Sequence, residues 1–350
     1  MKGNGDSGIG VLGAKGPTAN LISNNTVTNN GRFGIEIKNS TGNGSDSGAG
    51  SVVVSGNIVA RNVAATDLRD YAGILVMRRS PVVGNNADQP SSAVVTGNTV
   101  SGYRLATVGS TGDGFGIVIE GINNTVKQNI VTDNDIAIQV QGGNVANTQS
   151  TDFFDRGDAA NGSALVNRNS LVGNSIGLRT VGTAATALLN GTCNWWGNVD
   201  GPSGSGPGTG DIVAANITFN PWLGSNDLNG PCATPAVQFS AATATVAENG
   251  GTIALEVTLS EAAGQIIKVS YATSNGTATA GSDYTAQSGT LTFNPGVTSQ
   301  TINVPISNNS LYEGNETFQV TLSNPVYATL GALDEIEVTI QEDDAPPVVQ

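Results

Sequence analysis

The stretch Asn129-Ile130-Val131-Thr132-Asp133-Asn134, which leads to Ile136-Ala137-Ile138, decides the fold of the first half of the chain. A short run rich in β-branched residues is followed by an Asn/Asp corner and then by a second short run of apolar residues. Such short apolar runs are typical of strands, and no stretch shows the period of about 3.6 residues that marks an amphipathic helix. Asn tolerates left-handed backbone conformations, so it suits a tight corner between two strands.

The same unit recurs along the first half of the chain. Its other copies are Asn24–Ile37, Gly56–Val76, Gly97–Ile119 and Asn169–Leu178. Stacked coils of short parallel strands with Asn at the corners form a right-handed parallel β-helix, a solenoid whose narrow apolar interior every coil helps to fill. We therefore predict an all-β chain in which residues 1–225 form such a solenoid.

The segments Asn194-Trp195-Trp196-Gly197 and Pro221-Trp222-Leu223 contain all three tryptophans of the chain. A bare solenoid end would expose apolar interior and strand edges, so we expect the indoles to cap it. The alternative is a tryptophan platform on which sugars stack. Together, the repeats and this ending resemble parallel β-helix proteins of the pectate-lyase-like type, many of them bacterial.

The chain has only two cysteines, Cys193 in the expected cap and Cys232 just beyond it. A disulfide between them would close a loop of about 40 residues and stabilise the protein by roughly 3–4 kcal/mol in the chain-entropy picture. We predict this disulfide, the alternative being two separately buried thiols. Because disulfides need an oxidising compartment, the pair favours an exported protein.

The N-terminal Met1-Lys2-Gly3 is followed by no apolar segment, so we do not expect a signal peptide here. We interpret the chain as an excerpt of a longer secreted or cell-surface protein, of bacterial type. No run approaches the length of about 18 apolar residues that a spanning helix needs, so we expect no direct membrane insertion.

From Val237 onward the strands are longer and turn signals separate them, which predicts an immunoglobulin-like Greek-key β-sandwich over residues 237–345. Residues 226–236 would be a linker, and 346–350 the stub of another. Five motifs occur in this half: Val246-Ala247-Glu248-Asn249, Gly281-Ser282-Asp283-Tyr284, Gly289-Thr290-Leu291-Thr292-Phe293, Tyr312-Glu313-Gly314-Asn315-Glu316-Thr317-Phe318 and Ile340-Gln341-Glu342-Asp343-Asp344. In this order they resemble the Calx-beta domain, known from sodium–calcium exchangers and many bacterial surface proteins.

Charge is concentrated in this second half. Residues from 236 onward contain 12 acidic side chains and one basic, a net charge of −11, out of −14 for the whole chain. An acidic module of this kind repels nucleic acid, which we exclude as a partner, and favours cations. The alternative is that the acidic side chains are merely solvated.

The resemblance implies a calcium site built from loop residues at one end of the sandwich, since calcium takes six to eight oxygen ligands. The implied ligands are Glu248, Asp283, Asn309, Glu313, Glu342, Asp343 and Asp344. Where the family commonly has paired Asp, this chain has Asn308 and Asn309, so we expect fewer or weaker ions than in the exchangers. We expect Glu316 to be structural.

The chain has no histidine, which excludes Ser-His-Asp and Cys-His hydrolases and histidine-ligated zinc. Polysaccharide lyases on this fold use a basic residue beside carboxylates that hold calcium. Two loops could supply such groups, and their candidates are Asp67, Arg69, Asp70, Asp155 and Arg156. Neighbouring Arg and Asp residues in loops are more often exposed ion pairs.

These patterns favour an extracellular or cell-surface structural or adhesive protein, with a carbohydrate-contacting solenoid and a calcium-binding sandwich. Its partners would be polysaccharides or neighbouring surface modules, and self-association is a further option. The alternative is a polysaccharide lyase or another carbohydrate-active enzyme on the β-helix.

Overall fold

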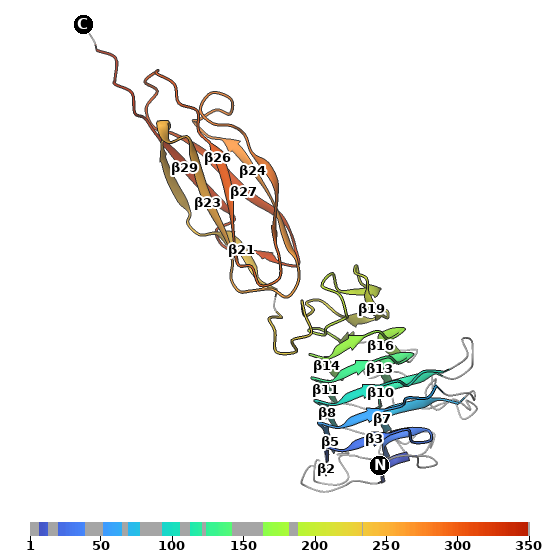
Figure 1. Ribbon diagram of the computed structural model, residues 1–350. Helices are drawn as coiled ribbons and strands as arrows, with labels where there is room; N and C mark the ends of the chain where they lie inside the picture. Colours follow the sequence, from blue (N-terminus) through green and yellow to red (C-terminus); the bar gives the residue numbers. More distant parts are fainter. Residues whose placement is uncertain are drawn as a thin grey trace. The chain divides into compact units, whose positions relative to one another are not determined.

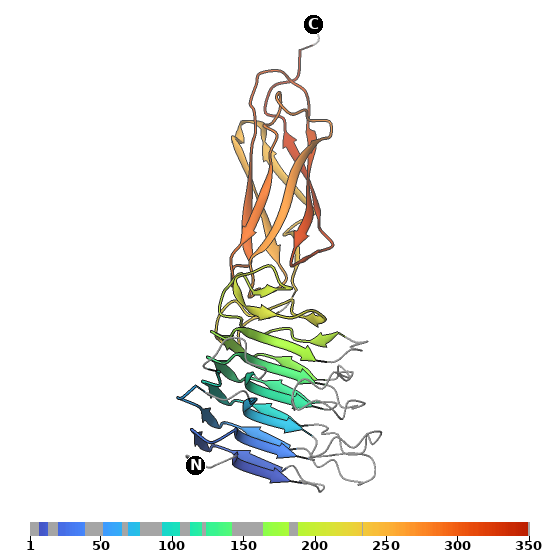
Figure 2. The same cartoon turned by 90° about the vertical axis from the view of Figure 1, so that its right-hand side faces the viewer.

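The computed structural model describes residues 7–12, 20–38, 52–64, 69–77, 93–105, 113–120, 124–141, 164–181, 188–232 and 234–348 (Figures 1 and 2). The chain divides into two compact units, Met1–Gly230 and Pro231–Gln350, and this boundary lies inside the predicted linker. Within the described residues the one helical element is a short 3₁₀ turn, η2 (Glu248–Gly250). No helix among them is long and apolar enough to cross a membrane. The prediction of an all-β chain is confirmed.

The first unit is built from three sheets of parallel strands, and successive turns of the chain add one strand to each sheet (Figure 1). The first sheet has the order β1 (Ser7–Leu12), β4 (Phe33–Lys38), β7 (Tyr71–Met77), β10 (Gly114–Glu120), β13 (Ile136–Gln141), β16 (Ile176–Val181), β19 (Gly210–Val213) and β18 (Pro202–Gly204). The second has the order β2 (Asn20–Ser23), β5 (Val52–Ser55), β8 (Val94–Thr96), β11 (Thr125–Lys127), β14 (Leu165–Asn167), β17 (Leu189–Asn190) and β20 (Ile217–Thr218). The third contains β3 (Thr26–Thr28), β6 (Ile58–Ala60), β9 (Thr99–Ser101), β12 (Ile130–Thr132) and β15 (Ser170–Val172). Figure 2 shows the blue-to-green strands of this unit stacked as parallel arrows, and the predicted parallel β-helix is confirmed.

Aliphatic side chains stack in register inside the solenoid, one ladder from each sheet. They are Ile35, Ile74, Ile117, Ile138 and Leu178; Ile22, Val54, Val95, Val126 and Val166; and Val27, Val59, Val100, Val131 and Leu171. The interior is narrow enough to require glycine beside these ladders. A Cβ on Gly73 would lie 2.3 Å from Cγ1 of Val100, and one on Gly116 would lie 2.4 Å from Cγ1 of Val131.

Asparagine side chains form a hydrogen-bonded ladder along the corner between the second and third sheets. Its members are Asn25, Asn57, Asn98, Asn129, Asn169 and Asn194. At a typical step the backbone N–H and Nδ2 of Asn98 both donate to Oδ1 of Asn129, at 3.0 and 2.9 Å. The same Nδ2 donates to the carbonyl oxygens of Val54 and Thr96. Each corner thereby binds both to its own coil and to its neighbours.

The cap at the end of the solenoid buries two of the three tryptophans. Trp196 and Trp222 are 0% and 1% exposed, and Nε1 of Trp222 donates to the carbonyl oxygen of Val199 at 3.1 Å. Side chains that are this buried cannot form a platform for sugars, so the capping interpretation fits these two residues. Cys193 and Cys232 are both disulfide-bonded, and because the chain has no other cysteine, the predicted bridge between them is confirmed.

The second unit is a sandwich of two sheets. One has the order β26 (Ser299–Pro305), β23 (Thr252–Leu259), β21 (Ala236–Phe239) and β28 (Thr329–Leu330). The other has the order β22 (Thr243–Ala247), β29 (Glu335–Gln341), β27 (Glu316–Val326), β24 (Ile267–Asn275) and β25 (Ser288–Phe293). Phe239, Phe293, Phe318 and Tyr284 fill the space between the sheets, and the rings of Tyr284 and Phe318 stack with centroids 4.3 Å apart.

The Greek-key sandwich predicted from the sequence would have antiparallel pairing throughout. In the structure two of the strand pairs are parallel instead. β21 pairs in parallel with β28, and β22 pairs in parallel with β29. The reason is that the chain changes sheets between β21 and β22, so β22 continues in the same direction along the edge of the opposite sheet. As a consequence, the C-terminal ends of β22 and β29 lie side by side.

The asparagine ladder makes the first unit sensitive to single side-chain deletions. Asn129→Ala should destabilise it by about 1–3 kcal/mol or more, because the buried groups that Asn129 satisfies lose their partner. Thermal unfolding followed by circular dichroism would measure this loss. Asn62→Ala is the matched control, since Asn62 is exposed. Equal melting temperatures for the two variants would contradict a structural role for the ladder.

The disulfide gives a second test of the structure. Denatured but unreduced protein, produced under oxidising conditions, should show no free thiol in a colorimetric titration, and reduced protein should show two. Removing the bridge by replacing both cysteines with Ser should cost roughly 2–5 kcal/mol of stability. Two free thiols in the unreduced sample would refute the bridge.

Candidate metal centre

The acidic side chains of the second unit gather where several strands begin or end. Val246 of β22 is paired with Ile340 of β29, so Glu248 and Glu342, each just past the end of its strand, lie at the same edge. Glu316, the first residue of β27, pairs with Ile340 from the other side. The loop between β24 and β25 adds Asp283, held by a hydrogen bond from the backbone N–H of Ser307 to its carbonyl oxygen.

One group of carboxylates consists of Glu248, Glu342 and Asp343. One oxygen from each lies within 4.8 Å of the others, and only 6% of Glu248 is exposed. Burial, together with the negative charges of Glu342 and Asp343, raises the pKa of Glu248. Glu342 is different, because hydrogen bonds from the backbone N–H groups of Asp344, Glu313 and other residues lower the pKa of its carboxyl. Glu342 is therefore a fixed negative charge that faces a buried carboxyl.

A second group consists of Asp283, Glu313 and Glu316, again with one oxygen from each within 4.8 Å of the others. Burial, and after it the adjacent Asp283, raises the pKa of Glu316 from 4.5 to about 7. Asp283 is 7% exposed, and its Oδ2 accepts a hydrogen bond from the backbone N–H of Thr279 at 2.6 Å. Like charges held this closely repel one another unless a proton or a cation lies between them.

Asn309 connects the two groups as a hydrogen-bond donor. Its backbone N–H donates to Oε1 of Glu248 at 2.9 Å, and its Nδ2 donates to Oε2 of Glu313 at 3.0 Å. The side-chain oxygen of Asn309 accepts from the backbone N–H of Leu311 at 2.6 Å. In this structure, then, Asn309 supplies donors to the carboxylates, and its oxygen is already engaged.

Asp344 shows that a cation suits this end of the sandwich. Its Oδ2 is buried and has no hydrogen-bond partner among the described residues. Burial raises the pKa of the Asp344 carboxyl, and the charges of Asp343 and Glu342 add to the effect. A buried carboxylate oxygen without a partner is costly, and a metal ion would satisfy it. Because the candidate ligands are oxygens and most are carboxylates, they fit a hard divalent cation such as calcium or magnesium.

The structure brings five of the seven predicted ligands into the two groups, with Asn309 between the groups and Asp344 in neither: they are Glu248, Asp283, Glu313, Glu342 and Asp343. Glu316, which we expected to be structural, lies with Asp283 and Glu313 in the second group. Its position three residues after Glu313, at the start of a strand, was the signal available in the sequence. What the sequence did not show is that β27 starts beside the end of β29.

Two of the five candidate catalytic residues lie within the described part of the chain. Asp67, Asp155 and Arg156 lie outside the described residues. Arg69 is exposed, whereas Asp70 is 4% exposed and its Oδ1 accepts a hydrogen bond from the backbone N–H of Asp113 at 3.1 Å. Asp70 therefore has a structural contact between neighbouring coils.

Comparison with known proteins finds relatives of the second unit. Residues 233–344 match the model of the Calx-beta domain family. Sodium/calcium exchanger 1 from Canis lupus familiaris is 36% identical over 118 residues, which are 28% of this chain and 12% of the exchanger. Sodium/calcium exchanger Calx from Drosophila melanogaster is 32% identical over 100 residues, which are 29% of this chain and 10% of that protein.

Solved structures similar to this chain include the apo-form Calx CBD1 domain, which is 30% identical, with a TM-score of 0.30 over 32% of this chain and 100% of that one. Another is the calcium binding domain CBD12 of CALX1.1, which is 31% identical, with a TM-score of 0.30 over 31% of this chain and 46% of that one. The chain thus spans a small part of the exchangers that it matches. The family match and the order of the acidic motifs agree on the second unit: residues 233–344 are a Calx-beta domain.

Proposed function

We propose that the Calx-beta domain of this chain binds calcium, and that the chain is part of a secreted or cell-surface structural and adhesive protein whose solenoid contacts carbohydrate. One observation carries the calcium proposal. Two groups of carboxylates meet at one end of the sandwich, next to the unsatisfied buried oxygen of Asp344.

Each group has the composition of a calcium site. Glu248, Glu342 and Asp343 would hold one ion and Asp283, Glu313 and Glu316 a second, with water or backbone carbonyls completing the six to eight oxygens that calcium takes. Four backbone N–H groups, those of Glu313, Gly314, Asp343 and Asp344, already donate to the two carboxylate oxygens of Glu342, so an ion would bind there by displacing some of these donors. When bound, calcium supplies positive charge that offsets the repulsion between these carboxylates.

Calcium would act mainly on the mechanical properties of the domain. The candidate ligands come from η2, from the loop between β24 and β25, from the residues before β27 and from the segment after β29. The first ion would join η2 to the segment after β29, and the second would join the β24–β25 loop to the start of β27. Each ion would therefore link two separate parts of the chain at one end of the sandwich. Calcium would therefore stiffen that end, as a spacer or joint in an extracellular protein requires.

Two features support an extracellular setting. The Cys193–Cys232 disulfide needs an oxidising compartment to form. Asn308 and Asn309 add no negative charge beside the carboxylates, which favours a weaker site. Extracellular calcium modules work with dissociation constants of about 10⁻⁴–10⁻³ M, so a weak site suits that environment.

The solenoid surface supports a scaffold more than an enzyme. Along the third sheet, the outward positions of successive strands carry Thr26, Ile58, Thr99 and Ile130 in register. These side chains are uncharged, and Ile58 and Ile130 are 51% and 44% exposed. A flat, uncharged strip of this kind suits contact with a neutral polymer or with another module.

Calcium should stabilise the Calx-beta domain. Binding to the folded state alone adds RT ln(1 + [L]/Kd), about 2.7 kcal/mol at a hundredfold excess over Kd. We expect the domain to melt at a higher temperature in millimolar calcium than in chelator, as followed by differential scanning calorimetry of the full chain. The double variant Asp283→Asn/Asp343→Asn should lose this difference.

A matched control changes the same charge outside the site. Glu261→Gln/Glu337→Gln also removes two negative charges, and both residues are exposed and lie outside the two groups. This control should keep the full response to calcium. Identical melting of the wild type with and without calcium, together with no heat in a calorimetric titration, would show that the acidic side chains are only solvated.

The pKa of Glu316 predicts how stability depends on pH when no metal is present. Because its pKa in the folded state, about 7, lies above the ordinary value of 4.5, the folded domain binds this proton more tightly than the unfolded chain does. In chelator, stability should therefore be highest near and below pH 4.5 as far as this group is concerned, and should fall as the pH rises through about 7.

Melting temperatures in chelator between about pH 5 and pH 8 would measure this dependence. Glu316→Gln should flatten it, since that variant has no proton to exchange. In calcium the trend should reverse, because protons compete with the metal and affinity weakens as the pH falls. A wild-type melting temperature in chelator that rises from about pH 6 to pH 8 would contradict this account.

A further inference from the structure

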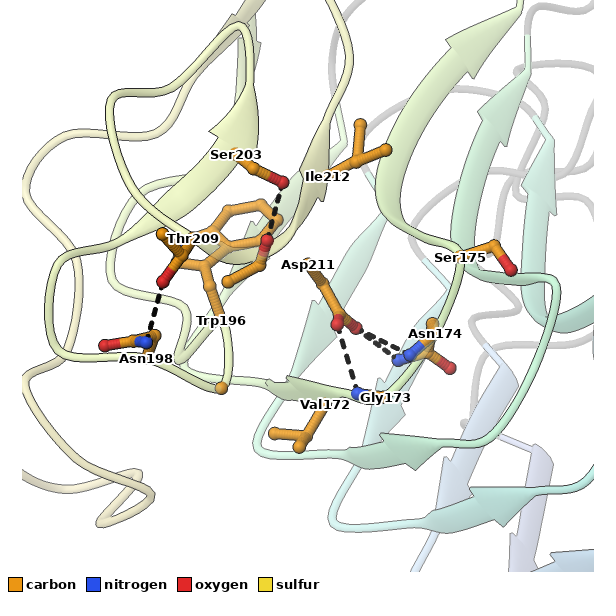
Figure 3. Close-up of a pocket in the computed structure, with 12 residues that line it drawn as sticks. Val172, Gly173, Asn174, Ser175, Trp196, Asn198, Ser203, Thr209, Asp211 and Ile212 are labelled. Carbon is orange, nitrogen blue, oxygen red and sulfur yellow. Dashed lines mark hydrogen bonds between the residues drawn. The ribbon is translucent and has the colours of Figure 1, made fainter.

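A pocket lies in the last coil of the solenoid, far in sequence from the carboxylates of the Calx-beta domain. Its volume is about 380 Å³, within the range of roughly 300–1,000 Å³ typical of small-molecule sites. Figure 3 shows Val172, Asn174 and Ser175 on one side and Asn198 and Thr209 on the other. Neither calcium binding by the second unit nor capping of the solenoid, the two roles described above, requires this cavity.

A second ladder of hydrogen-bonded asparagine side chains ends at the pocket. Asn134 donates from Nδ2 to Oδ1 of Asn174 at 2.9 Å, and Asn174 donates in turn to Oδ2 of Asp211 at 2.8 Å. Asp211 also accepts from the backbone N–H groups of Gly173, at 3.0 Å, and Asn174, at 2.9 Å (Figure 3). A carboxylate has about four acceptor positions, so these three donors leave Asp211 able to accept one more hydrogen bond.

The opposite wall offers hydroxyl and amide groups. Ser203 donates from Oγ to the carbonyl oxygen of Gly210 at 2.6 Å, which leaves the lone pairs of that hydroxyl as acceptors. Nδ2 of Asn198 donates to Oγ1 of Thr209 at 2.7 Å and has a second hydrogen to donate. Donors and acceptors are therefore both within one small cavity.

Apolar surface completes the lining. Val172 and Ile212 border the pocket, with Ile212 40% exposed, and the fully buried Trp196 forms part of its wall. A few convergent polar groups beside apolar surface is the usual composition of a small-molecule site. Hydroxyl groups of a ligand could replace water at the polar groups while its C–H faces cover the aliphatic side chains.

The charge of the side chains that line the pocket restricts the charge of the ligand that it could bind. The side chains that line the pocket include one anion, Asp211, and no cation. Arg104 donates to the carbonyl oxygen of Gly173, but its guanidinium is paired with Asp133 at 2.5 Å. A uronate or phosphate would meet the negative charge of Asp211, whereas the guanidinium of Arg104, which acts on Asp211, is already shared with Asp133 and does not line the pocket, so an anionic ligand is disfavoured.

We propose that this pocket binds a single neutral, hydroxyl-rich sugar unit. The proposal deepens, and rests on, the carbohydrate-contacting role proposed above for the solenoid. It assigns the contact to the last coil and specifies neutral sugars over the acidic polymers on which lyases act.

Nuclear magnetic resonance of the full chain can test the proposal at the pocket itself. The chain has three tryptophans, so its ¹⁵N spectrum contains three indole N–H signals. Nε1 of Trp196 has no hydrogen-bond acceptor among the described residues, whereas that of Trp222 donates to Val199. We expect titration with the methyl glycosides of glucose, galactose or mannose to shift the Trp196 signal, identified with Trp196→Phe, and to leave that of Trp222 in place.

A blocking variant and a matched control locate the binding. Ser175 is exposed at the pocket, so Ser175→Tyr should fill the cavity and weaken binding by about tenfold or more without disturbing the fold. Ser205→Tyr places the same side chain at an exposed position of the cap that does not line the pocket, and it should bind as the wild type does. Circular dichroism melts would show that both variants are folded.

Three results would overturn the proposal: no shift with any neutral glycoside, shifts only with galacturonate or only with glucosamine, or unchanged binding by Ser175→Tyr. A second experiment measures retention of the chain on columns of neutral polysaccharide. It distinguishes failure of the pocket proposal from failure of the carbohydrate-contacting role proposed for the solenoid. If Ser175→Tyr is retained as well as wild type, the solenoid contacts carbohydrate elsewhere. If neither is retained, the carbohydrate role fails as well, while the calcium response of the same sample tests the Calx-beta domain independently.

Discussion

Hydrogen bonds between buried asparagine side chains fix the register of the solenoid, and the rest of the first unit depends on that register. Each corner amide accepts from the coil before it and donates to the coil after it, so a slip of one coil would break every step of the ladder. With register fixed, identical positions stack, and the valines and isoleucines of each sheet form continuous ladders. The pocket lies where a second asparagine ladder ends. Asp211 accepts a hydrogen bond from Asn174, the last asparagine of that ladder, and no further coil follows within the described residues.

The Calx-beta domain depends on a different constraint, the repulsion between carboxylates that the topology forces together. Parallel pairing of β22 with β29 sets Glu248 beside Glu342, and the start of β27 adds Glu316. Strand pairing and the aromatic core hold this arrangement, so the carboxylates cannot move apart without loss of packing. Burial, and after it the neighbouring negative charges, raises the pKa of Glu248, of Glu316 and of Asp344. A site under such repulsion is ready to bind a divalent cation.

The two units combine different physical chemistry in one chain. The solenoid is nearly neutral and is built by repetition, whereas the Calx-beta domain carries most of the net charge. The chain's carbohydrate contact and its calcium response would then be separate properties, since the residues that carry them belong to different units.

The sequence alone determined the repeating coils, the capping tryptophans, the disulfide and the Calx-beta motifs, because each depends on local pattern or on a pair of unique residues. It also identified Glu248, Asp283, Glu313 and the Glu342–Asp344 run as loop acids. Only the tertiary structure decided how these side chains group. The parallel pairing at the edge of the sandwich, the inclusion of Glu316 and the use of Asn309 as a donor to Glu248 depend on contacts between residues 24 to 94 positions apart. The sequence did not reveal the pocket beside Asp211, because its lining comes from separate segments of the chain that only the fold brings together.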